Sequence, residues 1–187
     1  YRIRSLSNVF VKLDRKTKIQ NEDIVLNELI DDVILLFKKT LAEMHIKVDC
    51  NYAYIPKIRA SYYVLSQIVS AVLLNAIEAS EKNSIVYIRT FYNSATKETD
   101  GTVGVHLIDY GRGIDATVIG NVFNPFFSTK PNHLGLGLTQ VLGFANNNEY
   151  SIDLKSVPNE QTHFSLSIPV FETHQLERNK DWMNFSV

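Results

Sequence analysis

The stretch from Ser61 to about Glu81 constrains the fold most strongly, because it is a long and largely apolar helical pattern. Its apolar residues recur every three to four positions, which is the spacing of one buried helix face. They are Val64, Leu65, Ile68, Val69 and Val72. Such a face needs a second layer of structure to cover it. The rest of the chain must therefore supply that layer.

The segments around this helix predict the covering layer to be a sheet. Residues 84–92 are rich in β-branched and aromatic side chains, and 103–108 form the returning strand after a polar hairpin loop. The other predicted elements are a helix from Asn27, its cap, to about Met44, strands at 45–50 and 55–58, a helix at 138–146, and strands at 150–156 and 162–170. This order predicts an α+β fold, a two-layer sandwich with helices packed on one face of a mixed, mostly antiparallel sheet.

Composition excludes several classes of protein. The 187 residues are enough for one domain, and 45% hydrophobic with 21% charged residues is the balance of a soluble globular protein. A net charge of -1 argues against a general nucleic-acid binder. Cys50 is the single cysteine, so a reducing compartment is the simpler interpretation. We find no run of 18 apolar residues to predict a membrane span. The chain begins at Tyr1 without a signal-peptide pattern, so we expect a piece of a longer protein.

Asn75 lies in the middle of the apolar helix, where its amide needs a polar partner. One interpretation ties the amide to a neighbouring loop. The other makes Asn75 a magnesium ligand, because a side-chain carbonyl oxygen is a hard donor. Glu78, one turn further on, could hold a magnesium-bound water or be an ordinary exposed helix charge.

Asp109 ends a predicted strand and is followed by Gly111 and Gly113. A carboxylate in this position can accept a hydrogen bond from an exocyclic amine such as that of adenine. Glycines allow positive φ angles and close approach of the backbone to a ligand. A plain Asp-x-Gly turn is the alternative.

Residues 124–130 and 134–139 form two loops, and the second leads directly into a helix. Backbone N–H groups at a helix start bind phosphate, and Lys130 could reach a terminal phosphate. Phe126 and Phe127 would pack the loop when it closes. The alternative is a mobile surface loop with an incidental lysine. The glycine spacing fits neither a Walker A motif nor the dinucleotide-binding Gly-x-Gly-x-x-Gly.

Taken in order, these segments resemble the motifs of the GHKL ATPases, the superfamily of gyrase B, the large ATP-dependent chaperones, MutL and histidine kinases. The resemblance covers roughly residues 25–170 and implies the Bergerat fold. Residues 73–79 resemble the N-box, Asp109-x-Gly111-x-Gly113 the G1 box, 121–130 the F-box, 135–138 the G2 box, and Thr162-x-Phe164 the closing strand of histidine kinases.

This resemblance implies a role for each matching residue. Asn75 would coordinate the magnesium ion that bridges the phosphates of ATP, and Asp109 would recognise the adenine amine with help from Thr162. Phe126 and Phe127 would anchor the lid. The Ser-Thr-Lys sequence that ends in Lys130 resembles nitrogen-regulation-type sensor kinases with short lids. The other expected ATP contacts are Glu78, Ala79, Gly111, Gly113, Ile114, Gly135, Leu136, Gly137 and Leu138.

The function implied is that of the catalytic domain of a two-component sensor histidine kinase. Residues 23–171 would bind ATP and Mg²⁺, 1–22 would end a dimerisation and phosphoacceptor helix, and 172–187 would form a tail. The γ-phosphate would go to a histidine outside this chain, because none of the five histidines has the helical, acid-flanked context of a phosphoacceptor. Expected partners are that histidine's domain in the same protein, a response regulator and a second copy through the N-terminal helices, with no nucleic acid. We expect a cytoplasmic domain, whose parent could be anchored in the inner membrane.

Five residues depart from the family pattern, and they keep two alternatives open. Ala71 replaces the usual polar residue four positions before Asn75, and His133, Asn148-Glu149 and Gln161 replace glycines. The first alternative is a degenerate kinase-like module that binds nucleotide, or nothing, and signals without phosphotransfer. The second is an ATPase of the gyrase or chaperone type, which the missing glutamate at position 71 and the short lid disfavour.

Overall fold

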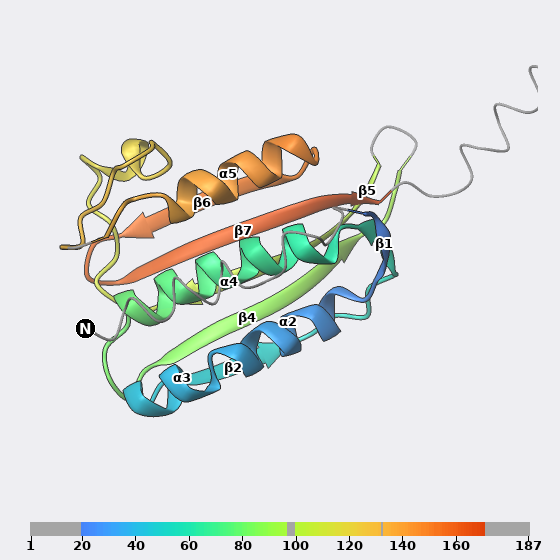
Figure 1. Ribbon diagram of the computed structural model, residues 1–187. Coiled ribbons are helices and arrows are strands. Elements are labelled where there is room, and N and C mark those ends of the chain that lie inside the picture. The colour runs from blue at the N-terminus through green and yellow to red at the C-terminus, as the bar shows by residue number, and fades with distance from the viewer. Residues whose placement is uncertain (1–19, 97–99, 132, 171–187) are drawn as a thin grey trace, which may run out of the picture.

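The computed structural model describes residues 20–96, 100–131 and 133–170 (Figure 1). The tail expected at 172–187 lies outside these residues. Most of the segment assigned to 1–22 lies outside them too.

A five-stranded mixed sheet forms one layer of the molecule, in the order β2-β4-β5-β7-β6. β2 pairs in parallel with β4, and the other three neighbouring pairs are antiparallel. The strands are β2 Lys47–Asn51, β4 Ile85–Asn93, β5 Gly101–Asp109, β6 Ser151–Val157 and β7 Gln161–Val170. The predicted mixed, mostly antiparallel sheet is confirmed.

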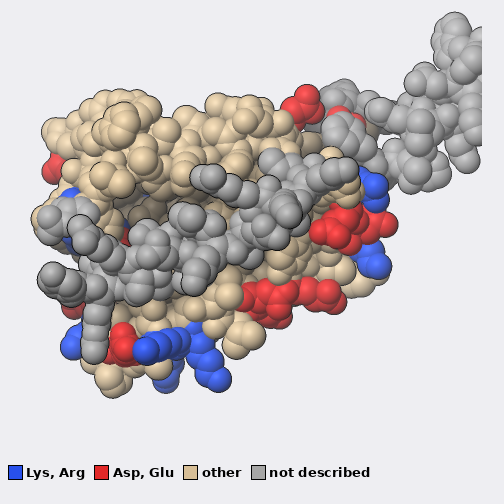
Figure 2. Space-filling view, in the orientation of Figure 1, with Lys and Arg blue, Asp and Glu red and all other residues tan. Residues whose placement is uncertain are grey.

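The helices α2 Leu26–Leu36, α4 Tyr62–Ala79 and α5 Gly137–Asn147 cover one face of this sheet (Figure 1). Fully buried side chains from both layers meet between them, among them Leu65, Ile68 and Leu73 of α4 and Ile88 and Leu166 of the sheet. The sequence of α2 holds acidic but no basic side chains, and on the helix side in view a red group lies over α2 with blue side chains beyond its ends (Figure 2). The two-layer α+β sandwich is therefore confirmed.

The central helix α4 begins as its sequence predicts. Ser61 is its N-cap, and the Ser61 hydroxyl accepts a hydrogen bond from Val64 N at 3.3 Å. The helix stops at Ala79, because Ser80 adopts an extended backbone. Among the described residues α4 is the helix long and apolar enough to cross a membrane, but 56% of it is buried inside the domain. It is the core helix that the apolar stripe predicts.

The predicted helix at 27–44 is wrong in two respects. It divides into α2 and α3 Lys38–Met44, because Phe37, with φ -93° and ψ 1°, leaves the helical region while its ring stays buried. Asn27 is not the cap either, since Val25 holds that position. The Asn27 amide instead donates to Ala53 O at 3.2 Å.

The other differences concern short elements. A small second sheet pairs β1 Glu22–Ile24, which the sequence did not predict, with β3 Ile58–Ala60. β3 lies slightly after the strand expected at 55–58. After the Asp109 loop the chain forms a single 3₁₀ turn, η1 Ile119–Asn121.

Candidate functional site

Asp109 is the last residue of β5, and its side chain is buried, with 4% of the residue exposed. Gly111 N donates to Asp109 Oδ1 at 3.1 Å. Burial raises the pKa of this carboxyl to about 6, against the opposing effects of the Gly111 hydrogen bond and the charge of Lys130. Above pH 6 the fold thus holds a buried carboxylate, whose Oδ2 has no hydrogen-bond partner among the described residues.

Both glycines after Asp109 are required by the space around them. A Cβ on Gly111 would overlap the carbonyl group of Ala79, the last residue of α4. That carbonyl also accepts from Arg112 N at 3.2 Å, so the loop is fastened to the end of α4. Gly113 has a φ of 62°, and a Cβ there would overlap the Val157 carbonyl at the end of β6. The loop is thus held between α4 and β6.

Ser156 connects this loop to β7, and sequence reasoning missed it. Its hydroxyl accepts from Ile114 N at 2.8 Å and donates to Gln161 O at 2.9 Å. Since a serine has only one proton to give, the 3.0 Å contact with Thr162 Oγ1 has Thr162 as its donor. Thr162 pairs directly with Asp109 across the strands. A serine in a strand gives no sequence signal for this role.

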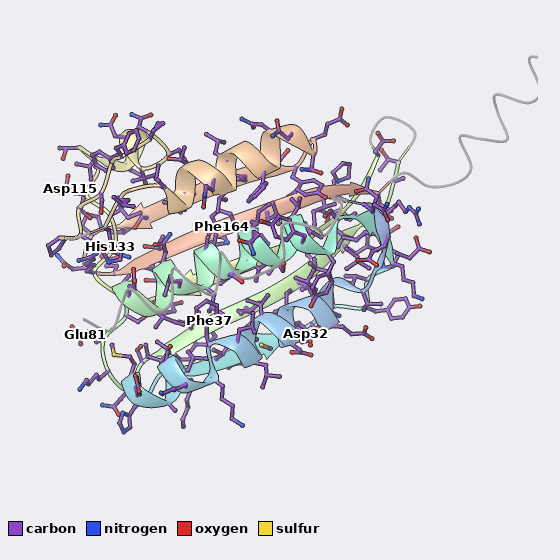
Figure 3. The ribbon with its side chains drawn as sticks, viewed as in Figure 1. Asp32, Phe37, Glu81, Asp115, His133 and Phe164 are labelled. Atoms are coloured by element: carbon purple, nitrogen blue, oxygen red, sulfur yellow. The ribbon has the colours of Figure 1, made fainter. Side chains whose placement is uncertain are left out.

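A second group of polar side chains gathers on the exposed side of α4. Lys130 Nζ lies 2.5 Å from Glu78 Oε2 and 3.4 Å from Asn75 Oδ1. His133 Nε2 lies 3.9 Å from the other Glu78 oxygen. Figure 3 shows His133 at the end of the molecule where α4 finishes. The Asn75 side chain therefore contacts a neighbouring loop, as one of the two interpretations expected. The contact joins the Asn75 carbonyl oxygen to the ammonium of Lys130, which Glu78 also binds.

The two loops after η1 are fastened to each other. Gly135 has a φ of 66°, and a Cβ there would overlap the Phe127 carbonyl. Thr139 Oγ1 donates to Phe123 O at 3.1 Å. Phe126 is 77% exposed with a φ of 63°, so in this structure its ring does not pack the loop. Its packing on closure stays a prediction.

The start of α5 leaves backbone donors available. Leu136 is the N-cap residue, and no side chain caps the helix there. Gly137 opens the helix, and the space that a Cβ would occupy there is free. Leu138 follows and is half-buried. The first N–H groups of an α-helix have no partner within the helix, so these can meet an anion.

The site therefore consists of a buried carboxylate at a strand end, an oxygen-and-lysine group on α4, and uncapped donors on α5. Residues 62–172 match the family model described as "Histidine kinase-, DNA gyrase B-, and HSP90-like ATPase". The chain belongs to this family. Within it, the chain is a sensor-histidine-kinase catalytic domain, and domains of this kind bind ATP.

Relatives of this ATPase domain support the assignment. The chain is 27% identical over 171 residues to the sensor histidine kinase ZraS of Klebsiella oxytoca, covering 90% of the chain and 36% of the relative. It is 34% identical over 113 residues to the sensory histidine kinase/phosphatase NtrB of Rhodobacter capsulatus, covering 57% and 32%. The chain thus spans about a third of the length of these curated relatives.

Solved structures agree with the fold of the ATPase domain. The catalytic domain of histidine kinase ThkA superimposes with a TM-score of 0.68 at 25% identity, over 81% of this chain and 96% of that one. The mycobacterial sensor histidine kinase MprB gives 0.69 at 21% identity, over 80% and 97%. About four-fifths of this chain therefore corresponds to nearly the whole of each of those solved chains.

Proposed function

We propose that this ATPase domain binds ATP with Mg²⁺ and transfers the γ-phosphate to a histidine outside the chain. The observation that carries the proposal is the buried carboxylate of Asp109, one oxygen of which accepts no hydrogen bond from the residues that the structure describes. Burial of a charged group is unfavourable, and charged groups buried in this way cluster at functional sites. A ligand-binding role for Asp109 would account for its burial at the end of β5. The role that fits is recognition of the adenine amine.

Adenine recognition follows from the polarity of the groups around Asp109. The adenine amine has hydrogens to donate. When Asp109 is ionised, its Oδ2 accepts hydrogen bonds and cannot donate one. The Thr162 hydroxyl stands directly opposite and donates to Ser156, so its oxygen can accept as well. Gly111 and Gly113 bring backbone close to this point without side chains to obstruct a flat base.

The group on α4 fits a magnesium ion. Asn75 and Glu78 offer oxygen donors, which Mg²⁺ prefers, and the ammonium of Lys130 already lies against both. Asn75 would bind the ion and Glu78 a water on it. When bound, Mg²⁺ neutralises phosphate charge. Lys130 would then leave Glu78 and bind the terminal phosphate, because its flexible stem allows it to exchange one anion for the other.

The loops and α5 would complete the phosphate site. Backbone N–H groups of Gly135, Leu136, Gly137 and Leu138 would face the phosphates. Phe126 and Phe127 would pack over the loop as it closes. Transfer would then depend on positioning and charge neutralisation, with little covalent chemistry for the protein to perform.

We further propose the setting in which the domain works. Residues 23–171 would be the ATP-binding domain, 1–22 the end of a dimerisation and phosphoacceptor helix, and 172–187 a tail. The phosphate would pass to a histidine of the same protein, which dimerises through its N-terminal helices, and then to a response regulator. The domain would lie in the cytoplasm. These partners fit the two-component relatives.

A second candidate is a nucleotide-binding module without phosphotransfer, and Ala71 favours it. Ala71 lies one helical turn before Asn75 and packs against the core. Its side chain is a methyl group, which can neither orient a nucleophile nor accept a proton. The domain would then bind ATP through Asp109 and signal through contacts with its partners.

One experiment separates these candidates. The full-length protein that carries this domain is incubated with γ-labelled ATP and Mg²⁺, and the label is tested for the acid-labile, base-stable behaviour of phosphohistidine. The proposal predicts label on a histidine outside residues 1–187, and markedly less label in an Asp109→Asn variant at ATP concentrations below saturation. ATP binding without any histidine label would select the module without phosphotransfer. Steady ATP hydrolysis by the isolated chain would favour an ATPase of the gyrase type.

A further inference from the structure

The sheet face opposite the helices carries two histidines side by side. His106 of β5 and His163 of β7 point away from the core, since their strand neighbours Leu107 and Phe164 are buried. His106 Nδ1 and His163 Nε2 are 3.1 Å apart. Neither residue belongs to the nucleotide site, which lies beyond the end of β5.

The arrangement of the rings favours a shared ion as much as a hydrogen bond. The ring centres are 4.9 Å apart, and the planes meet at 63°. A straight hydrogen bond over 3.1 Å would separate the centres by about 5.4 Å. Two rings that bind one ion at about 2.05 Å would have centres about 4.8 Å apart and an angle of about 98° at the ion. The observed separation lies close to the second value.

The ring of His106 is also held in position, and its neutral form is favoured. The His106 ring stacks on Phe91, with centres 4.6 Å apart and planes at 22°. Burial lowers the pKa of His106, and the neighbouring His163 and Arg89 lower it further. A neutral imidazole keeps the lone pair that a metal ion requires.

Other side chains on this face would complete the site. Ser165 pairs directly with His106, and Asp153 pairs directly with Ser165, so register brings a hydroxyl and a carboxylate to the same face. Asp153 is exposed and bonds Lys155 at 3.1 Å. A rotamer change would bring its carboxylate towards His163, its diagonal neighbour at about 7–8 Å between backbones.

We propose that His106 and His163 form a binding site for a late first-row divalent metal ion such as Zn²⁺, with water completing its coordination and Asp153 available as a third ligand. Among the described residues no group of three or more His, Cys, Asp or Glu side chains is arranged to hold a metal as it stands. The two imidazoles are therefore the primary ligands. Arg89 and Lys155 lie directly across from His106 and His163, and their positive charges oppose a cation, so we expect weaker binding than at a structural zinc site.

Metal binding would act on the nucleotide site through the sheet. The ion would join β5 to β7, and His163 adjoins Thr162, the direct partner of Asp109. An ion that binds only the folded chain stabilises it in proportion to its concentration. The site would therefore couple the stability of the strand pair to the availability of the metal.

The test is calorimetric titration of Zn²⁺ into the 187-residue chain at pH 7.5, without nucleotide, in a Cys50→Ser background that removes the exposed thiol. We expect one Zn²⁺ per chain and a raised melting temperature. His106→Gln and His163→Gln should each weaken binding at least about tenfold, and Asp153→Asn less. His45→Asn is the matched control, because His45 is exposed with a φ of 55° that asparagine tolerates, and it should change nothing.

Either of two results would rule out the metal site. Absence of saturable binding, or binding unchanged in both glutamine variants, would exclude the site. If a variant fails to fold, imidazole NMR signals of the unchanged chain decide the matter. Zn²⁺ must shift two histidine spin systems together, and excess Mg²⁺, which prefers oxygen ligands, must not reproduce the shift.

Discussion

Asp109 should make the domain less stable at neutral pH, so Asp109→Asn should stabilise the fold while it weakens ATP binding. Burial raises the pKa of this carboxyl from 3.8 to about 6. A carboxyl whose pKa is raised by folding does not lower the free energy of unfolding at pH values below its unfolded pKa. The loss of stability grows as the pH rises from the unfolded towards the folded pKa. A shift of about 2 units corresponds to about 3 kcal/mol above pH 6. Asparagine has nearly the same shape and can keep the hydrogen bond from Gly111 N.

Urea unfolding of the two chains at pH 8 and pH 4 measures this effect. Asp109→Asn should raise the free energy of unfolding by up to about 3 kcal/mol at pH 8 and leave it nearly unchanged at pH 4. A variant that is less stable at pH 8, or whose gain is the same at both pH values, would refute the reasoning. The slopes of the unfolding curves must agree for the comparison to hold.

The same substitution should weaken the affinity for ATP. The asparagine amide either turns its NH₂ group towards the adenine amine or loses its bond from Gly111, and an unpaired donor costs about 1–3 kcal/mol. Calorimetry should therefore show a loss of about tenfold or more. A stable variant with unchanged affinity would remove Asp109 from the adenine contact.

Three further substitutions test neighbouring parts of the account. The pKa of His106 is lowered by folding, so stability should fall as pH drops below about 6.5, and His106→Gln should flatten that slope in urea unfolding between pH 7 and 5. Gly135→Ala should weaken ATP binding about tenfold or more in calorimetry, because Gly135 has a positive φ and a Cβ there would overlap the Phe127 carbonyl. Gly120→Ala is the control and should leave the affinity unchanged, because the space for its Cβ is free. Ser156→Ala leaves Ile114 N without its partner and should lower the free energy of unfolding by about 1–3 kcal/mol in urea, and an unchanged value would mean that water replaces the hydroxyl.

Features set by neighbouring residues could be predicted from the sequence. Ser61 caps α4 through its own hydroxyl, three residues from the amide it bonds. The strands on either side of the 93–101 loop follow from β-branched runs and period-two alternation. The glycines at 111 and 113 indicate a tight turn without any knowledge of what surrounds it. Each of these signals depends on residues a few positions apart.

Features set by distant residues could not be predicted. Asn27 has the composition of a cap, but its amide donates to Ala53, 26 positions away. The pair of Ser156 and Ile114 spans 42 positions, and that of His106 and His163 spans 57. Such partners are chosen by strand register, which a single sequence leaves open.

The central claim is that Asp109 and the residues around it form a site for adenine, and titration of Mg-ATP and Mg-GTP into the same chain tests it most directly. Adenine presents an amine to Asp109 where guanine presents a carbonyl oxygen, which a carboxylate repels. The account predicts one ATP per chain and a GTP affinity at least about tenfold weaker. Equal affinities for the two nucleotides, or no binding of ATP, would contradict it.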